Sequence, residues 1–234
     1  IWSGASGNWS TGFTPTAPVT DKNLVFTGSG GTATNDIASG TLSSINYITF
    51  NSTAGAYTLN ATTGAAGLAG GTALTVKGDI LNNSSNAQTI AMNLAFGSSS
   101  TGIVETAAGN ITISGNISGT GALNKGGNST LTLTGVNTYT GTTTINAGTL
   151  QVGGSNGNIA GAIVNNANLV YTSSAFGIYG VTGTGNLTIN QSSGNVYLQG
   201  NITQSGTVSI TTSTATSTSG MIQSALGTQN TNRM

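Results

Sequence analysis

Few side chains in this sequence can take part in acid–base or nucleophilic chemistry, and they are widely spaced. The charged residues are Asp21, Lys22, Asp36, Lys77, Asp79, Glu105, Lys125 and Arg233, and the chain contains no His and no Cys. Two carboxylates about 5–10 Å apart could hydrolyse a glycosidic bond. Asp79 and Glu105 would lie in neighbouring coils of a regular repeat. We interpret both as solvated turn residues, because Asp79 directly follows Gly78 and lies close to Lys77.

Other reaction classes lack the residues that they need. A Ser–His pair has no base, a Ser–Lys pair would need one of only three lysines beside an activated Ser, and zinc sites lack their usual ligands. Two Gly-Thr-Gly stretches, at 119–121 and 183–185, begin like a nucleotide-binding fingerprint. The third Gly is missing, since Asn124 and Thr188 stand in its place. We therefore predict no catalytic residue, no metal site, no cofactor and no enzymatic activity.

The composition is polar yet almost uncharged. Gly (37), Thr (42), Ser (27) and Asn (27) make up more than half of the 234 residues, and the formal net charge is zero. No cluster of Lys and Arg could neutralise phosphates, and no run of about 18 apolar residues could span a bilayer. The sequence therefore argues against nucleic-acid binding and against a membrane-spanning segment. The lack of charge repulsion between molecules favours self-association.

Short apolar–X–apolar triads recur along the chain at a nearly constant spacing. They begin at Leu74, Met92, Ile111, Leu131, Leu150, Leu169, Leu187 and Val208. The middle residue is polar in all copies but one, so the first and third residues would face an interior and the middle residue would face solvent. Turns rich in Gly, Asn and Ser separate two or three such strands in each repeat. This pattern predicts an all-β fold, a parallel β-helix (β-solenoid) with about 19 residues per coil.

The middle residues of the triads would form an outward row along the solenoid. A regular row of Thr hydroxyls on a flat β-solenoid could bind ice. Thr occupies only half of these middle positions, at Thr75, Thr112, Thr132 and Thr188. We therefore do not expect a lattice-matched array.

The two ends of the chain differ from the repeat and from each other. Residues 1–20 hold both Trp and both Pro, and we expect them to cap the first coil, because an open solenoid end invites strand pairing. We assign residues 21–210 to the solenoid, and residues 211–234 to a tail, a cap or a subunit junction. The residues that would form such a junction are Trp2, Trp9, Phe13, Met221, Ile222 and Leu226.

A longer motif spans residues 119–153. Its characteristic residues are Gly119, Gly121, Leu123, Lys125, Leu131, Leu133, Gly135, Asn137, Tyr139, Gly141, Gly148 and Leu150. This motif resembles the passenger-associated transport repeat of bacterial autotransporters, although the family usually has Gly where this chain has Asn128. The resemblance implies a right-handed β-helix, secretion and display on a bacterial surface. It also implies a role of the repeat in passenger folding and transport.

The sequence is compatible with two origins and three functions of this chain. Autotransporters end in a membrane β-barrel, for which the residues after 211 do not suffice, so we expect either a fragment or a free-standing secreted subunit. Our leading hypothesis is a non-enzymatic extracellular structural protein that assembles head to tail with itself into a surface or matrix fibre. Contact between two different ends propagates without closing. The alternative is a monomeric adhesin or passenger fragment that binds host or glycan ligands, and the third hypothesis is a carbohydrate-active β-helix enzyme.

Overall fold

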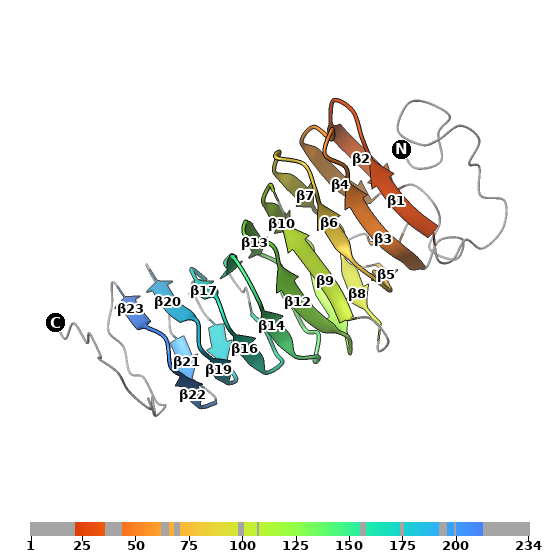
Figure 1. Cartoon of the computed structure of the whole chain (residues 1–234). Coiled ribbons are helices and arrows are strands. Elements are labelled where there is room, and N and C mark those ends of the chain that lie inside the picture. Colours follow the sequence, from red (N-terminus) through yellow and green to blue (C-terminus); the bar gives the residue numbers. More distant parts are fainter. Residues whose placement is uncertain are drawn as a thin grey trace.

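The protein is a β-solenoid, as the sequence predicts. The computed structural model describes residues 22–35, 44–61, 66–67, 71–97, 101–106, 108–154, 158–173, 176–191, 196–198 and 200–212, and these ranges contain strands but no helix. Parallel strands stack in about seven coils roughly 21 residues apart. Figure 1 shows the stack running from β1 and β2 at one end to β23 at the other. The right-handed sense, which parallel crossovers strongly prefer, stays a prediction.

One side of the solenoid, which we call face 1, is a sheet of nine parallel strands. Its order is β2, β4, β7, β10, β13, β15, β17, β20 and β23. Their bounds are Gly31–Asn35, Tyr57–Ala61, Gln88–Ile90, Ile111–Ile113, Thr130–Leu133, Thr149–Val152, Asn168–Tyr171, Asn186–Gln191 and Val208–Thr212. Apolar and polar residues alternate along these strands, so that one side of each strand is buried and the other faces solvent.

The other two sides complete each coil. Face 2 holds β5 Leu74–Val76, β8 Leu94–Phe96, β11 Ile117–Gly119, β18 Phe176–Ile178 and β21 Val196–Leu198. Face 3 holds β6 Ile80–Asn82, β9 Thr101–Thr106, β12 Ala122–Gly126, β14 Thr143–Ile145, β16 Ile163–Asn165, β19 Val181–Gly183 and β22 Ile202–Gln204. The long strand β3 (Ser44–Phe50) pairs with β1 (Lys22–Phe26) on one side. On its other side β3 pairs first with β5 and then with β6, so it spans both faces.

The strand register confirms the predicted period in one half of the solenoid and corrects it in the other. From Ile111 to Val208, residues that lie opposite each other on face 1 are 18 to 21 residues apart. The triads at Leu74 and Met92, however, do not belong to this row. Leu74 begins β5 on face 2, and Met92 precedes β8 on the same face. The prediction of one row of eight triads was therefore wrong, because a buried triad has the same pattern on any face.

The strand that precedes β10 on face 1 is β7, not a strand of the Leu74 or Met92 triads. Gln88 of β7 lies opposite Ile111 of β10, 23 residues away. The step from β4 to β7 is longer still, since Leu59 lies opposite Ile90. The extra residues of this coil lie between β4, which ends at Ala61, and β5. The early coils are therefore longer than the predicted 19 residues.

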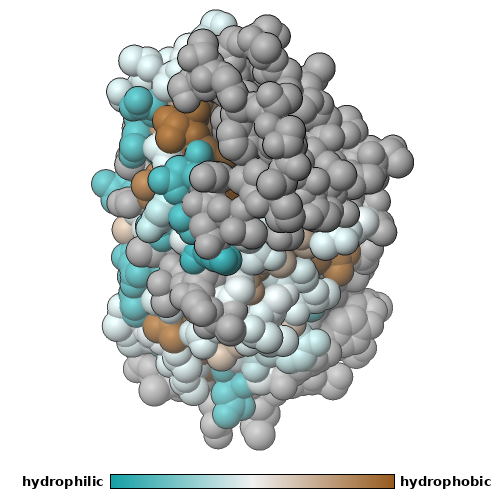
Figure 2. All heavy atoms as spheres, turned by 90° about the vertical axis from the view of Figure 1, so that its right-hand side faces the viewer, coloured by the Kyte–Doolittle hydropathy of each residue, from teal (hydrophilic) through white to brown (hydrophobic). Residues whose placement is uncertain are grey.

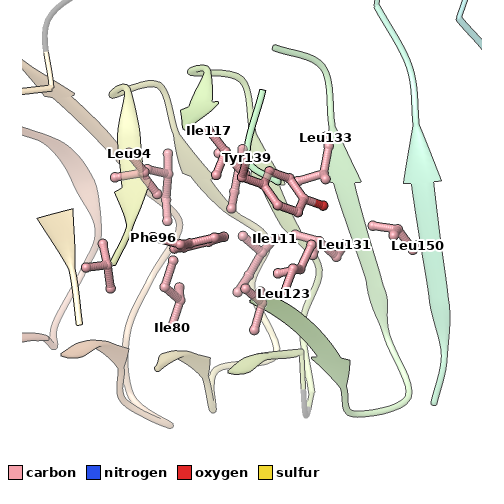
Figure 3. Close-up of a cluster of buried hydrophobic side chains, with 14 of the residues drawn as sticks. Ile80, Leu94, Phe96, Ile111, Ile117, Leu123, Leu131, Leu133, Tyr139 and Leu150 are labelled. Carbon is pink, nitrogen blue, oxygen red and sulfur yellow. The ribbon is translucent and has the colours of Figure 1, made fainter. Parts of the chain in front are cut away.

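The three faces enclose a single apolar interior. Leu59, Ile90, Ile113, Leu133 and Val152 form one continuous inward row of face 1, and each is fully buried. In Figure 3 the side chains of faces 1, 2 and 3 meet around Phe96 and Tyr139, whose ring centroids are 6.0 Å apart in an edge-to-face arrangement. Burying one aliphatic side chain of this size contributes about 1.5–3 kcal/mol. Stacked apolar rows thus stabilise a chain that has no disulfide.

Candidate functional site

The transport-repeat motif occupies two successive coils, from the end of β11 to β15. Its four leucines point inward and are fully buried: Leu123 on β12, Leu131 and Leu133 on β13, and Leu150 on β15. Leu131 lies opposite Leu150 in the register of face 1, so the motif repeats the same inward position in consecutive coils. Figure 3 shows these leucines in the core, with Leu133 beside the ring of Tyr139. The apolar part of the motif is therefore core.

Lys125 is the unusual residue of the motif, because its side chain points into the solenoid and is fully buried. It lies at the end of β12, where the chain turns from face 3 to face 1. Its ammonium nitrogen donates hydrogen bonds to the carbonyl oxygens of Gly126 (2.6 Å) and Gly127 (2.8 Å) in its own coil, and of Ala147 (3.1 Å) in the next coil. An ammonium group has three donors, so these carbonyls satisfy it. Lys125 thus joins two corners by hydrogen bonds.

Asn137 and Tyr139 hold the corner between faces 1 and 2. The Asn137 side chain accepts a hydrogen bond from the N–H of Ile117 in the previous coil (3.2 Å) and donates one to the carbonyl oxygen of Gly135 (3.0 Å). The Tyr139 hydroxyl lies 2.7 Å from the Thr143 hydroxyl inside the core. Burial raises the pKa of Tyr139 far above its ordinary value, and the hydrogen bond with Thr143 offsets only part of this effect.

The motif glycines stand where the main chains of adjacent coils approach each other closely. A Cβ atom on Gly135 would clash with the carbonyl oxygen of Gly115, and one on Gly141 would clash with that of Gly121. Gly119 and Gly148 also have positive φ angles, of 102° and 65°, which residues with a Cβ rarely adopt. The N–H of Gly121 donates to the carbonyl oxygen of Phe96 at 3.0 Å. These glycines therefore permit main-chain contact between coils.

Sequence reasoning missed a series of buried polar side chains at the face 3 to face 1 corner. Asn82 donates to the carbonyl oxygens of Asn86 (3.0 Å) and Asn110 (3.2 Å), the second of which belongs to the next coil. Asn165 donates to the carbonyl oxygen of Asn186 (2.9 Å) and to the side-chain oxygen of Gln204 (3.2 Å). Each stands at the third, inward position of a triad. A polar residue at that position is the sequence signal for the buried polar side chains of this corner, which are Asn82, Lys125, Asn165 and Gln204.

The two carboxylates singled out from the sequence lie on successive coils of face 3. Asp79 precedes β6, and Glu105 lies in β9 opposite Leu81. Asp21 and Asp36 lie outside the described residues. Within the described ranges, no three His, Cys, Asp or Glu side chains come together as a group that could hold a metal ion. The side chains of Lys125, Asn137 and Tyr139 form hydrogen bonds with other groups of the solenoid itself, so the arrangement supports a structural role.

The residues expected at a subunit junction, Trp2, Trp9, Phe13, Met221, Ile222 and Leu226, lie outside the described residues. The last described strand, β23, does show an open end. Its Ile210 lies opposite the fully buried Ile189 of β20, yet 41% of its own surface is exposed. Val208, on the same inward side, is only partly buried. The apolar row of face 1 therefore extends to the surface at this end.

Comparison with known proteins identifies the motif. The family model of the passenger-associated-transport-repeat matches residues 123–152, from Leu123 on β12 to Val152 on β15. No curated protein and no solved structure matches the chain. The repeat and the β-solenoid together fit an autotransporter passenger β-helix. In the described part of the chain, no helix has the length and apolar character needed to cross a membrane.

Proposed function

We propose that this chain is a non-enzymatic structural element of the passenger type, secreted or displayed on the cell surface, and that it assembles head to tail into a fibre. The transport repeat suggests a passenger domain and, with it, a surface or secreted location. The residues of the transport-repeat motif favour a structural role over a catalytic one. Their side chains fill the core or bind the main chain of neighbouring coils.

The observation that carries the fibre proposal is the half-exposed Ile210 at the end of an otherwise buried row. Among the described residues, β23 pairs only with β20, and at the opposite end β2 pairs only with β4. A strand with one free edge is a template for further pairing. Docking β2 of one molecule onto β23 of the next would continue the parallel sheet and cover Ile210. The two contacting ends differ, so this association would not close on itself.

The first experiment is negative-stain electron microscopy of the untagged chain over a concentration series. Thin filaments of uniform width are expected. Isolated short rods at every concentration would overturn the fibre proposal and favour the alternative, a monomeric adhesin or passenger fragment that binds a glycan or another surface ligand. Deleting 1–20 or 211–234 in separate variants tests whether those segments contribute to the junction.

A matched pair of substitutions locates the junction. Ile210→Lys places a charge in the apolar end of the stack, whereas Thr203→Lys places the same charge on the exposed outer side of β22 in the same coil. We expect Ile210→Lys to abolish filaments and Thr203→Lys to retain them. Equal loss in both variants would mean that added charge, and not the end of face 1, controls assembly.

The proposed lack of enzymatic activity has its own test. Asp79 and Glu105 are the carboxylate pair that the fold places on successive coils. We expect no release of reducing sugar from a panel of neutral and acidic polysaccharides. Release that disappears in both Asp79→Ala and Glu105→Ala would instead establish a carbohydrate-active enzyme.

A further inference from the structure

Face 1 presents an outer surface without a single charged side chain among the described residues. Its outward positions on the nine strands are Thr32, Thr34, Thr58, Asn60, Thr89, Thr112, Thr130, Thr132, Thr149, Gln151, Asn168, Val170, Asn186, Thr188, Asn190, Ser209 and Thr211. The charged residues of the described chain lie elsewhere: Lys22 in β1, Lys77 and Asp79 between β5 and β6, Glu105 in β9, and Lys125 in the interior. The whole sheet thus forms one neutral surface.

The strand register shows a more regular outward row of Thr side chains on face 1 than the triad spacing predicted. Five consecutive strands of face 1, from β2 to β13, each place a Thr opposite the Thr of the next strand. These residues are Thr32, Thr58, Thr89, Thr112 and Thr132. The sequence-based row, which began with Thr75, was therefore wrong for the first half of face 1, because Thr75 lies in β5 on face 2. The row continues less regularly through Gln151, Val170, Thr188 and Ser209. β-branched side chains are stiff at χ1, so little side-chain entropy is lost when such a row is covered.

Three amide side chains on the outer surface of face 1 have hydrogen-bond partners on or beside the sheet. Asn186 donates to the side chain of Asn168 (3.3 Å), which in turn donates to the carbonyl oxygen of Gly148 (3.1 Å). Gln151 donates to the Thr172 hydroxyl at 3.4 Å. Covering these three amides therefore costs less than covering amides without a partner would.

We infer that face 1 binds face 1 of a second copy of this chain, side by side, in a two-fold symmetric pair. The chemistry of the surface argues for this occupant. A surface without cations does not attract phosphates, and a surface without outward aromatic rings offers no platform for stacking on sugars or bases. An uncharged sheet with an in-register Thr row complements another such sheet, as in the dry interfaces between stacked parallel sheets of low charge.

The area of face 1 fits a weak pair. Nine strands spaced about 4.8 Å apart, each three to six residues long at about 3.3 Å per residue, cover on the order of 500 Å². A pair would bury on the order of 1,000 Å² in total, near the lower limit of specific interfaces. On the described part of the surface in Figure 2, pale and teal areas predominate and the brown areas are small and separate. This contact is independent of the end-to-end junction.

The test is sedimentation of the untagged chain over a concentration series, with charges placed on face 1. Thr112→Lys/Thr188→Lys puts two positive charges in the outward row, and Ser114→Lys/Asn190→Lys puts them at exposed positions beside it, in case the first variant does not fold. The matched control, Thr182→Lys/Thr203→Lys, carries the same charges on exposed positions of face 3. We expect the face 1 variants to raise the dissociation constant of the pair at least tenfold and the control to leave it unchanged.

Mixing two oppositely charged face 1 variants tests whether pairing can be restored. A Thr112→Glu/Thr188→Glu variant should be monomeric alone and should pair with the corresponding Lys variant. A wild-type chain that pairs no better than the face 1 Lys variants would overturn the inference. A monomeric wild type that shapes growing ice crystals would also overturn it and would assign the Thr row to ordered water. Filaments that persist in the face 1 variants, without lateral pairs, would separate this contact from the fibre junction.

Discussion

The ammonium nitrogen of Lys125 lies 3.1 Å from the carbonyl oxygen of Ala147, one coil further along the solenoid. The strand β12 that carries Lys125 pairs with β14, which leads into the corner that contains Ala147. A positive charge in an apolar interior is costly unless hydrogen bonds satisfy it. Here the carbonyls of two successive corners do so. The only buried charge seen in the described interior therefore couples neighbouring coils of the transport repeat.

We expect Lys125→Met to destabilise the solenoid by about 2–4 kcal/mol, because three partly buried carbonyl groups lose a donor while the volume is nearly kept. The control is Asn124→Met, at the neighbouring half-buried position whose side chain points outward. Urea unfolding followed by circular dichroism measures both. If the two variants have the same midpoint, the three hydrogen bonds of Lys125 do not stabilise the corner.

Glycine at position 141 should be essential for coil spacing. A Cβ at Gly141 would clash with the carbonyl oxygen of Gly121, whereas a Cβ at Gly97 would meet only the Thr75 methyl, at 3.8 Å. We expect Gly141→Ala to cost about 1–3 kcal/mol through overpacking, and Gly97→Ala to change the free energy of unfolding by less than about 0.5 kcal/mol. Thermal unfolding distinguishes them. If Gly141→Ala left the free energy of unfolding unchanged, the coils could move apart at this position without loss of stability.

The sequence predicted the solenoid and its inward leucines because alternation along short strands is a local signal. Leu131 and Leu150 lie in the row where their spacing placed them. The same signal could not assign a face, and this is why the triads at Leu74 and Met92 were placed in the wrong row. Asn165 was missed for another reason. The pattern expects an apolar residue at the inward position, and only the fold shows that the corner offers a carbonyl oxygen to its amide.

Two asparagines test how far burial strengthens a corner hydrogen bond. Asn137 is buried and accepts a hydrogen bond from the N–H of Ile117, whereas Asn116 is exposed and accepts one from the N–H of Val136 at 2.8 Å. We expect Asn137→Ala to cost about 1–3 kcal/mol, because water cannot replace the lost acceptor, and Asn116→Ala to cost less than about 1 kcal/mol. Chemical denaturation measures the difference. A larger loss for Asn116→Ala would contradict this account.

The buried tyrosines make stability depend on pH at the alkaline end. Burial raises the pKa of Tyr139 and of Tyr171 above the ordinary value of 10.0, and for Tyr171 the nearby Tyr139 adds to the effect. Above that ordinary value the unfolded chain releases these protons while the folded chain retains them. The contribution to stability is therefore complete below about pH 10 and falls as the pH rises further. The urea midpoint should be flat from pH 8 to 9.5 and should decline above pH 10.

Phenylalanine substitutions identify the groups responsible for that decline. Tyr139→Phe/Tyr171→Phe removes both ionisable hydroxyls and keeps the rings that fill the core, so its urea midpoint should decline less above pH 10. Tyr139→Phe alone also removes the hydrogen bond with Thr143, so it should lower the midpoint at neutral pH as well. The exposed Tyr179 supplies the control, since Tyr179→Phe should leave the alkaline decline as in the wild type. An unchanged decline in the double variant would place the alkaline sensitivity in other groups and would contradict the assignment to the two buried hydroxyls.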